Sequence, residues 1–189
     1  MAQKLPNVYQ IKVTLSGARP PIWRRLQVWS TTDLAKLHYI IQVAMGWTDS
    51  HLHMFVAGNR QYGIPDPDFE DEMISEEGVL INALLKKAND SLMYEYDFGD
   101  GWEHKVILEK IIEYTPGQTV PRCITGRRSC PPEDVGGIPG YQEFLEAYID
   151  PDHPEHEEWV EWAGDYFDSE RFDVAEVNEI LSKKSEKPA

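Results

Sequence analysis

The chain has few cysteines, few basic residues and no long apolar run. Its 189 residues include 2 cysteines, which is far below the density of a disulfide-stapled secreted scaffold. No segment approaches the ~18 apolar residues that span a bilayer, and the N-terminal sequence has no apolar signal-peptide core. We therefore expect a cytoplasmic protein with no membrane segment.

Positive charge is also scarce. The 18 lysine and arginine residues face 33 aspartate and glutamate residues, so the formal net charge is −15. Such a surface repels phosphate backbones and anionic lipid head groups, and direct nucleic-acid binding is therefore not expected. Six arginines occur in small groups that the fold could gather into a basic patch, although scattered arginines in ion pairs are the simpler interpretation. These are Arg19, Arg24, Arg25, Arg122, Arg127 and Arg128.

The short motifs of common enzyme classes are missing. The sequence contains no Walker loop, no GxGxxG that opens a helix, no GxSxG and no HExxH. Asp97-Phe98-Gly99 is a turn and not a kinase motif, because no glycine-rich nucleotide loop accompanies it. The spacing of Cys123 and Cys130 excludes a zinc site made by cysteine alone. A thiol beside the neighbouring arginines could be reactive, but two ordinary reduced thiols are the simpler interpretation.

Alternating apolar residues predict strands in the first part of the chain. Segments 8–15 and 22–28 form one expected hairpin, and 51–62 forms another around Gly58. Between them, apolar residues at helical spacing over 34–45 predict a helix that Thr31 or Thr32 caps and Gly46 ends. A short helix at 80–87 follows, and two strands, 92–96 and 102–111, flank the tight turn 97–101.

The last third of the chain is expected to be a loop followed by helices. A loop rich in proline and glycine runs over 116–140, and apolar stripes predict helices at 141–148 and 159–163. Asp173 and Glu176 resemble a capping box that starts a last helix. We predict a single α+β domain over 1–189: a largely antiparallel sheet from the N-terminal two-thirds with one early helix, covered by C-terminal helices. The acidic segment 65–78 is expected to be an exposed loop, and 183–189 a short flexible tail.

Five residues are candidate ligands for a divalent metal. His51 and His53 lie two residues apart on an expected strand and would point to one face, while Asp97, Asp100 and His104 lie in or beside the tight turn. Imidazole and carboxylate groups are ligands that zinc, manganese or iron accept. The alternative for His104 is a packed core histidine, because it shares a strand face with apolar residues.

The segment 130–137 combines two prolines, two adjacent carboxylates and two glycines. This composition could present Glu133 and Asp134 rigidly into a cleft, where either could act as a catalytic base. The alternative is loop architecture, in which Asp134 makes an Asx-type turn.

Several of these segments, in this order, resemble the plasmid ORF-3-like family, which is named after an open reading frame on a root-inducing plasmid. The resemblance runs from about residue 9 to 181 and rests on Pro21–Arg25, His51–His53, Tyr96–His104, Cys130–Gly137, Gly140–Leu145, Phe172–Asp173 and Asn178. It implies an α+β fold and no agreed catalytic residues. Some family members are labelled transposon resolvases and others are joined to a repressor-type DNA-binding region, which implies a mobile-element or regulatory setting. The acidic composition does not support the resolvase label, because a recombinase grips DNA through a basic surface.

Three functions are compatible with these observations. The preferred hypothesis is a non-enzymatic binding or accessory module whose cleft holds a protein or a small ligand, because no complete catalytic motif is present. The alternative is a metal-dependent hydrolase that uses the histidine and aspartate set, with Glu133 or Asp134 as base. DNA-associated regulation through a separate partner ranks last.

Overall fold

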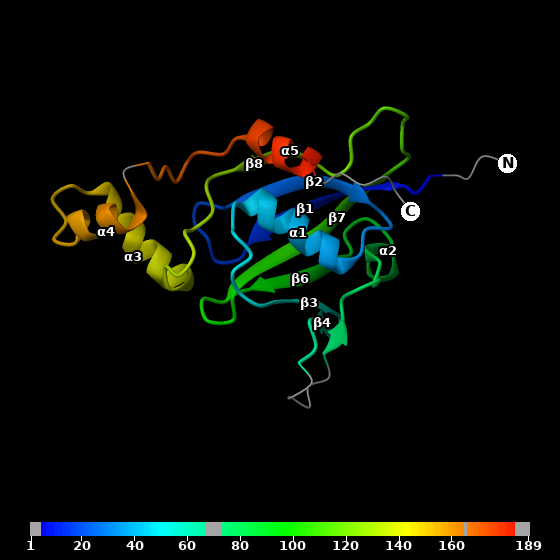
Figure 1. Cartoon of the computed structure of the whole chain (residues 1–189), viewed down its shortest axis with the longest axis horizontal. Coiled ribbons are helices and arrows are strands. Elements are labelled where there is room, and N and C mark those ends of the chain that lie inside the picture. Colours follow the sequence, from blue (N-terminus) through cyan, green and yellow to red (C-terminus); the bar gives the residue numbers. More distant parts are fainter. Residues whose placement is uncertain (1–4, 67–72, 165, 184–189) are drawn as a thin grey trace.

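A β-sheet forms the centre of the protein (Figure 1), and it has eight strands within the described residues. The computed structural model describes residues 5–66, 73–164 and 166–183. The strand order is β5-β4-β3-β6-β7-β1-β2-β8, and every neighbouring pair is antiparallel except β4 and β5. The strands are β1 (Val8–Leu15), β2 (Trp23–Trp29), β3 (His53–Ala57), β4 (Arg60–Gly63), β5 (Ile74–Ser75), β6 (Ser91–Tyr96), β7 (Trp102–Ile112) and β8 (Arg122–Arg127).

The helices pack on one face and at one end of this sheet. Helix α1 lies across the middle of the sheet in Figure 1, and α5 lies beside β8, whereas α3 and α4 lie next to each other beyond the end of the sheet. The helices are α1 (Leu34–Met45), α2 (Ile81–Leu84), α3 (Gly137–Ile149), α4 (His156–Ala163) and α5 (Val174–Lys183). The predicted α+β class, with a mostly antiparallel sheet, an early helix and C-terminal helices, is confirmed. Within the described residues, no helix is both long and apolar enough to cross a membrane.

The apolar periodicity of α1 explains its position. Leu34, Leu37 and Ile41 recur at helical spacing and are fully buried against the sheet. Gly46 ends the helix in the left-handed conformation, as expected, but the N-cap is Asp33 and not Thr31 or Thr32. The carboxylate of Asp33 accepts the backbone N–H of Lys36, which satisfies one of the free donors of the first turn.

Two other expectations need correction. The segment 116–140, expected to be a loop, contains β8, an edge strand that pairs only with β2 within the described chain. The acidic segment 65–78 is not wholly exposed: its residue Glu76 is buried, although 67–72 lie outside the described residues. Most of the expected C-terminal tail, 184–189, also lies outside them.

Candidate functional site

The predicted ligands lie near one end of the sheet, but the structure divides them. His51 belongs to the loop that precedes β3, and His53 is the first residue of β3. The strand alternation that would place both imidazoles on one face therefore does not extend to His51. Asp97 and Asp100 lie in the turn between β6 and β7, whereas His104 lies inside β7.

One group of side chains brings together His51, Asp97 and Asp134. Nε2 of His51 lies 3.8 Å from Oδ2 of Asp97 and 3.3 Å from Oδ1 of Asp134. Despite these distances, neither contact has hydrogen-bond geometry, and Nε2 of His51 is shielded from solvent without a hydrogen-bond partner. His51 and Asp97, which were predicted as metal ligands, thus lie beside Asp134, which was predicted as a catalytic base.

The tight turn after β6 fixes Asp97. Its backbone adopts a left-handed conformation (φ 59°), and its Oδ1 accepts the N–H of Gly99. Asp100, in the same turn, does not join the His51 group. Its Oδ2 accepts the N–H of Gly136, and this bond ties the turn to the 130–137 loop. A side chain at Gly137 would meet the carbonyl oxygen of Asp100 at 2.5 Å, which explains the glycine at this close approach.

Glu133 and its neighbour Asp134 have different partners. One of its carboxylate oxygens accepts the hydroxyl of Tyr96, and the other accepts the hydroxyl of Thr48. The Tyr96 oxygen in turn accepts the N–H of Ser50 at 2.9 Å. Burial and the bond to Glu133 raise the pKa of Tyr96. Glu133 therefore joins the loop after α1 to the 130–137 loop, and it is not a free base.

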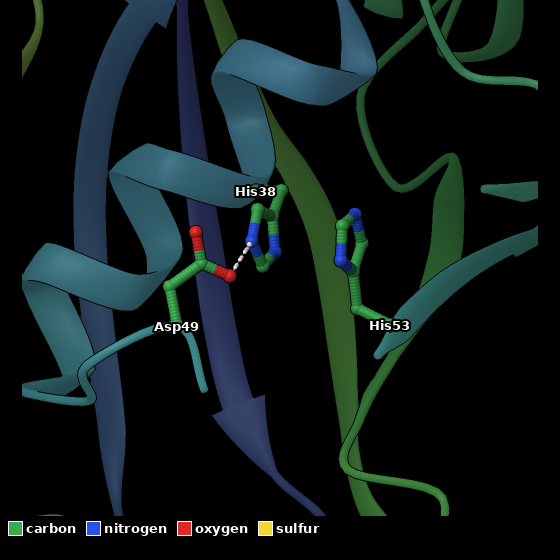
Figure 2. A group of neighbouring side chains, drawn as sticks. All are labelled: His38, Asp49 and His53. Carbon is green, nitrogen blue, oxygen red and sulfur yellow. Dashed lines mark hydrogen bonds and ion pairs between the residues drawn. The ribbon is translucent and has the colours of Figure 1, made fainter. Parts of the chain in front are cut away.

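His53 belongs to a second group, which Figure 2 shows. Its ring stacks on that of His38 from α1, with ring centroids 3.4 Å apart and planes 5° from parallel. Nε2 of His53 also contacts the buried carboxylate of Glu76 at 2.9 Å. On its far side His38 contacts Asp49 at 2.7 Å, through Nε2.

The His38 side of this group is a closed ring of hydrogen bonds. Asp49 donates its N–H to the amide oxygen of Gln42, and Gln42 donates its amide to the hydroxyl of Tyr94. Tyr94 is then able to donate to Nδ1 of His38, and His38 donates from Nε2 to Asp49. Burial lowers the pKa of His38 and raises that of Tyr94, which keeps both groups neutral.

The donor atoms of His38, His53 and Asp49 lie within 4.8 Å of one another, but this group is not arranged to hold a metal. An imidazole lone pair lies in the ring plane, and two nearly parallel rings cannot direct their lone pairs at one ion. Both nitrogens of His38 also already have partners.

His104 is a core residue far from coordination. It is fully buried and packs edge-on against Trp47, with ring centroids 5.2 Å apart. Burial lowers its pKa to about 4, although backbone groups of Trp102 and Tyr94 oppose the shift. Neither ring nitrogen has a hydrogen-bond partner of good geometry. His104 is therefore better described as a packed core histidine, the alternative considered above, than as a metal ligand.

Sequence reasoning missed His38, Asp49 and Glu76. His38 lies one residue after Leu37 on the buried face of α1, and a polar residue on an apolar helical stripe was the available signal. Nothing local in the sequence distinguished Asp49 or Glu76 from the many solvated acidic residues.

A groove of about 430 Å³ lies next to Trp47 and Glu133, which are part of its lining. It lies between the C-terminal end of α1, residues 129–133, and the segment 163–177 that includes the start of α5. Its lining includes four aromatic side chains, Trp47, Tyr166, Phe167 and Phe172, and four carboxylates, Glu133, Asp168, Asp173 and Glu176.

Arg24 lies buried at this groove. Its guanidinium donates to the carbonyl oxygens of Ala44, Trp23 and Arg127, and the ring of Phe172 lies 3.9 Å from it. No carboxylate of the described residues forms an ion pair with it. The carbonyl oxygens, one of them at the negative end of the α1 dipole, satisfy the charge instead.

Both cysteines are free and buried near Arg24. Burial raises the pKa of Cys123 to about 11 and that of Cys130 further, although Arg24 opposes both shifts. The thiols are therefore protonated at neutral pH, which is the reverse of an activated nucleophile.

Two proteins similar to this chain give the structure a context. An uncharacterized protein, y4hQ, from Sinorhizobium fredii (strain NBRC 101917 / NGR234) is 40% identical over 177 residues, which cover 93% of this chain and 91% of the relative. The crystal structure of a protein of unknown function, MM3350, from Methanosarcina mazei Go1 matches with a TM-score of 0.84 and 38% identity. That match covers 90% of this chain and 97% of the other.

The family model described as plasmid pRiA4b ORF-3-like protein matches residues 7–176. This range contains both the His51 group and most of the groove. The chain belongs to the plasmid pRiA4b ORF-3-like family, as its motifs predicted.

Proposed function

We propose that the protein is a non-enzymatic binding module and that its groove holds a basic, partly apolar segment of a partner protein. The observation that carries the proposal is the lining of the groove, where aromatic rings and carboxylates lie together. Aromatic faces and carboxylates both attract lysine and arginine side chains, and the rings also accept their apolar stems.

The charge balance of the groove favours a cationic occupant. Among its carboxylates, Glu176 is paired with Arg171, whereas Glu133, Asp168 and Asp173 form no ion pair within the described residues. Arg24 is shielded by Phe172 and bonded to backbone oxygens, so it offers little charge to a ligand. The formal net charge of −15 would steer a basic partner toward this surface.

The groove also has parts suited to recognition. The indole N–H of Trp47 donates to the carbonyl of Pro131 at 3.0 Å, which fixes the ring before any ligand arrives. Tyr166 is 93% exposed, an unusual position for a large aromatic side chain, and it could close over a bound segment. Basic segments are common in nucleic-acid-binding proteins, so a partner of that kind would fit the regulatory setting that the family resemblance implies.

The alternative, a metal-dependent hydrolase, draws support from the meeting of His51, Asp97 and Asp134. It is less well supported because both oxygens of Glu133 are occupied and both thiols are held protonated. Turnover in a panel of ester and phosphoester substrates, lost in His51→Ala, would establish the hydrolase and remove the binding module as sole function.

The binding proposal can be tested with synthetic peptides. A fluorescein-labelled twelve-residue peptide of alternating arginine and leucine is titrated with protein, and its anisotropy is compared with that of a glutamate–leucine peptide of the same length. We expect saturable binding of the basic peptide that weakens with salt, and none of the acidic one. Tyr166→Ala and Asp168→Asn should each weaken binding by roughly tenfold, which corresponds to about 1.4 kcal/mol.

The matched control is Glu143→Gln, an exposed charge on α3 that does not line the groove. It should leave the affinity unchanged. Equal losses in Glu143→Gln and Asp168→Asn would show that the peptide senses only the overall charge, and that result would overturn the proposal. Equal affinity for the acidic peptide would do the same.

A further inference from the structure

We infer that His51, Asp97 and Asp134 form a binding site for one divalent transition-metal ion, such as Zn²⁺ or Mn²⁺. This site is separate from the groove, and its existence does not depend on a basic partner binding there.

The spacing of the three donor atoms fits one ion. Two ligand atoms, each about 2.1 Å from a metal, lie about 3.4 Å apart when they subtend a tetrahedral angle. Nε2 of His51 lies 3.3 Å from Oδ1 of Asp134 and 3.8 Å from Oδ2 of Asp97, and all three atoms lie within 4.8 Å of one another. Small side-chain rotations would bring them to coordination distance.

The hydrogen-bond pattern leaves these atoms available. Nε2 of His51 is shielded from water and has no hydrogen-bond partner, which is costly for a polar atom unless something else occupies its lone pair. Oδ2 of Asp97 makes no hydrogen bond within the described residues, although its side chain is only 10% exposed. An ion between them would satisfy both atoms.

The surrounding structure holds the ligands in place. Asp97 is oriented through its other oxygen by the N–H of Gly99, the kind of support that second-shell bonds give to metal ligands. The ring of Tyr96 lies edge-on to His51, with centroids 5.9 Å apart. Asp97 and Asp134 both have left-handed backbones, so each carboxylate projects from a sharp turn.

Electrostatics also favour a cation. Neither Asp97 nor Asp134 pairs with a lysine or arginine in the described part of the chain, and two carboxylates close together repel each other. One imidazole with two carboxylates suits zinc, manganese or iron better than magnesium or calcium, which prefer oxygen alone. Because Asp134 is 72% exposed, the remaining coordination positions would face solvent.

The first test is metal titration of the full chain after chelator treatment. Calorimetry with ZnCl₂ should show saturable binding of one ion per chain. Asp134→Asn and His51→Ala should each lower the affinity at least ~10-fold, since even the loss of an outer-shell partner costs that much.

Asp100→Asn is the matched control. Asp100 shares the turn with Asp97, but among the described residues its carboxylate bonds only to the N–H of Gly136, and asparagine can still accept that bond. We expect unchanged metal affinity in this variant. Metal binding that survives in Asp134→Asn, or that is lost equally in Asp100→Asn, would overturn the site.

The second test locates the ion without a substitution. Paramagnetic Mn²⁺ should broaden the backbone amide signals near His51, Asp97 and Asp134 in a ¹⁵N-labelled sample. Broadening centred on the segment between α3 and α4, which contains Asp150, Asp152 and His153, would place the ion elsewhere and overturn the inference. The absence of any broadening at a tenfold excess of Mn²⁺ would also overturn it.

Discussion

The hydroxyl of Tyr94 lies 2.8 Å from Nδ1 of His38, deep under helix α1. Through this contact the ring of hydrogen bonds closes between α1, the loop after it and strand β6, because Tyr94 also accepts from Gln42. Every member has a partner, so the polar group is stable inside an apolar core. These bonds tie the loop after α1, which also carries His51, to α1 and β6, and they explain why a histidine on a buried helix face is tolerated.

Removing this hydroxyl should therefore destabilise the fold. Tyr94→Phe leaves Nδ1 of His38 and the amide of Gln42 buried without a partner, at a cost of about 1–3 kcal/mol in the free energy of unfolding. Tyr62→Phe is the control, because Tyr62 is also buried but its hydroxyl makes no hydrogen bond within the described residues. Urea denaturation of both variants measures the difference. Equal small losses of unfolding free energy in the two variants would show that the closed set of hydrogen bonds contributes nothing to stability.

His104 should make stability fall below neutral pH. Its pKa in the fold is about 4 against an ordinary value of 6.5, so the unfolded chain binds the proton first as the pH drops. Above pH 6.5 His104 is neutral in both the folded and the unfolded chain and does not reduce stability. Between pH 6.5 and 4 the free energy of unfolding falls by roughly 3 kcal/mol in all, because only the unfolded chain takes up the proton. The lowered pKa of His38 acts in the same direction.

The substitution that isolates this effect is His104→Leu. Leucine fills a similar volume among aromatic rings and removes two nitrogens without partners, so stability at pH 7.5 should change by less than about 1.5 kcal/mol. Between pH 6.5 and 4, the variant should lose less stability than the natural protein. Denaturation curves at several pH values provide the comparison, and parallel slopes would contradict the assignment.

Most of the fold follows from local pattern. The alternation over 8–15 coincides with β1, and the apolar stripe and Gly46 coincide with α1 and its end. Strand β8 could not be predicted in the same way. Of its six residues only Cys123 is buried, and an edge strand with one buried residue has no alternation to detect. Pairing with β2, a tertiary effect, makes it a strand.

The candidate site was harder to predict than the fold. The sequence indicated His51, Asp97 and Asp134 separately, by residue type and by their position near turns. Their proximity comes from the tertiary fold, which brings together the loop before β3, the turn between β6 and β7, and the 130–137 loop. The expectation that His51 and His53 share a site assumed that β3 begins at residue 51, and it begins at His53. His51 therefore lies outside the strand, and the alternation that would place it on the same face as His53 does not apply to it.

Adjacent arginines should differ sharply in their importance. Arg24 is buried, donates three hydrogen bonds to carbonyl oxygens and stacks on Phe172, whereas Arg25 makes a partly exposed pair with Glu109. Lysine cannot reproduce the planar fork of Arg24, so Arg24→Lys should cost roughly 2–4 kcal/mol. Arg25→Lys should cost less than about 1 kcal/mol. Thermal denaturation of the two variants distinguishes them, and similar melting temperatures would show that the buried bonds are not important.

The cysteines should be unreactive until the protein unfolds. Burial raises the pKa of Cys123 to about 11 and raises that of Cys130 further, so the thiolate is a minor species at pH 8. Iodoacetamide should therefore modify neither thiol at pH 8 in the folded protein within a time that fully labels free cysteine. In 6 M guanidinium chloride both should react, which mass spectrometry measures. Rapid labelling of Cys130 in the folded state would mean that the groove opens at its floor, and the thiol would then have to be reconsidered as a reactive group.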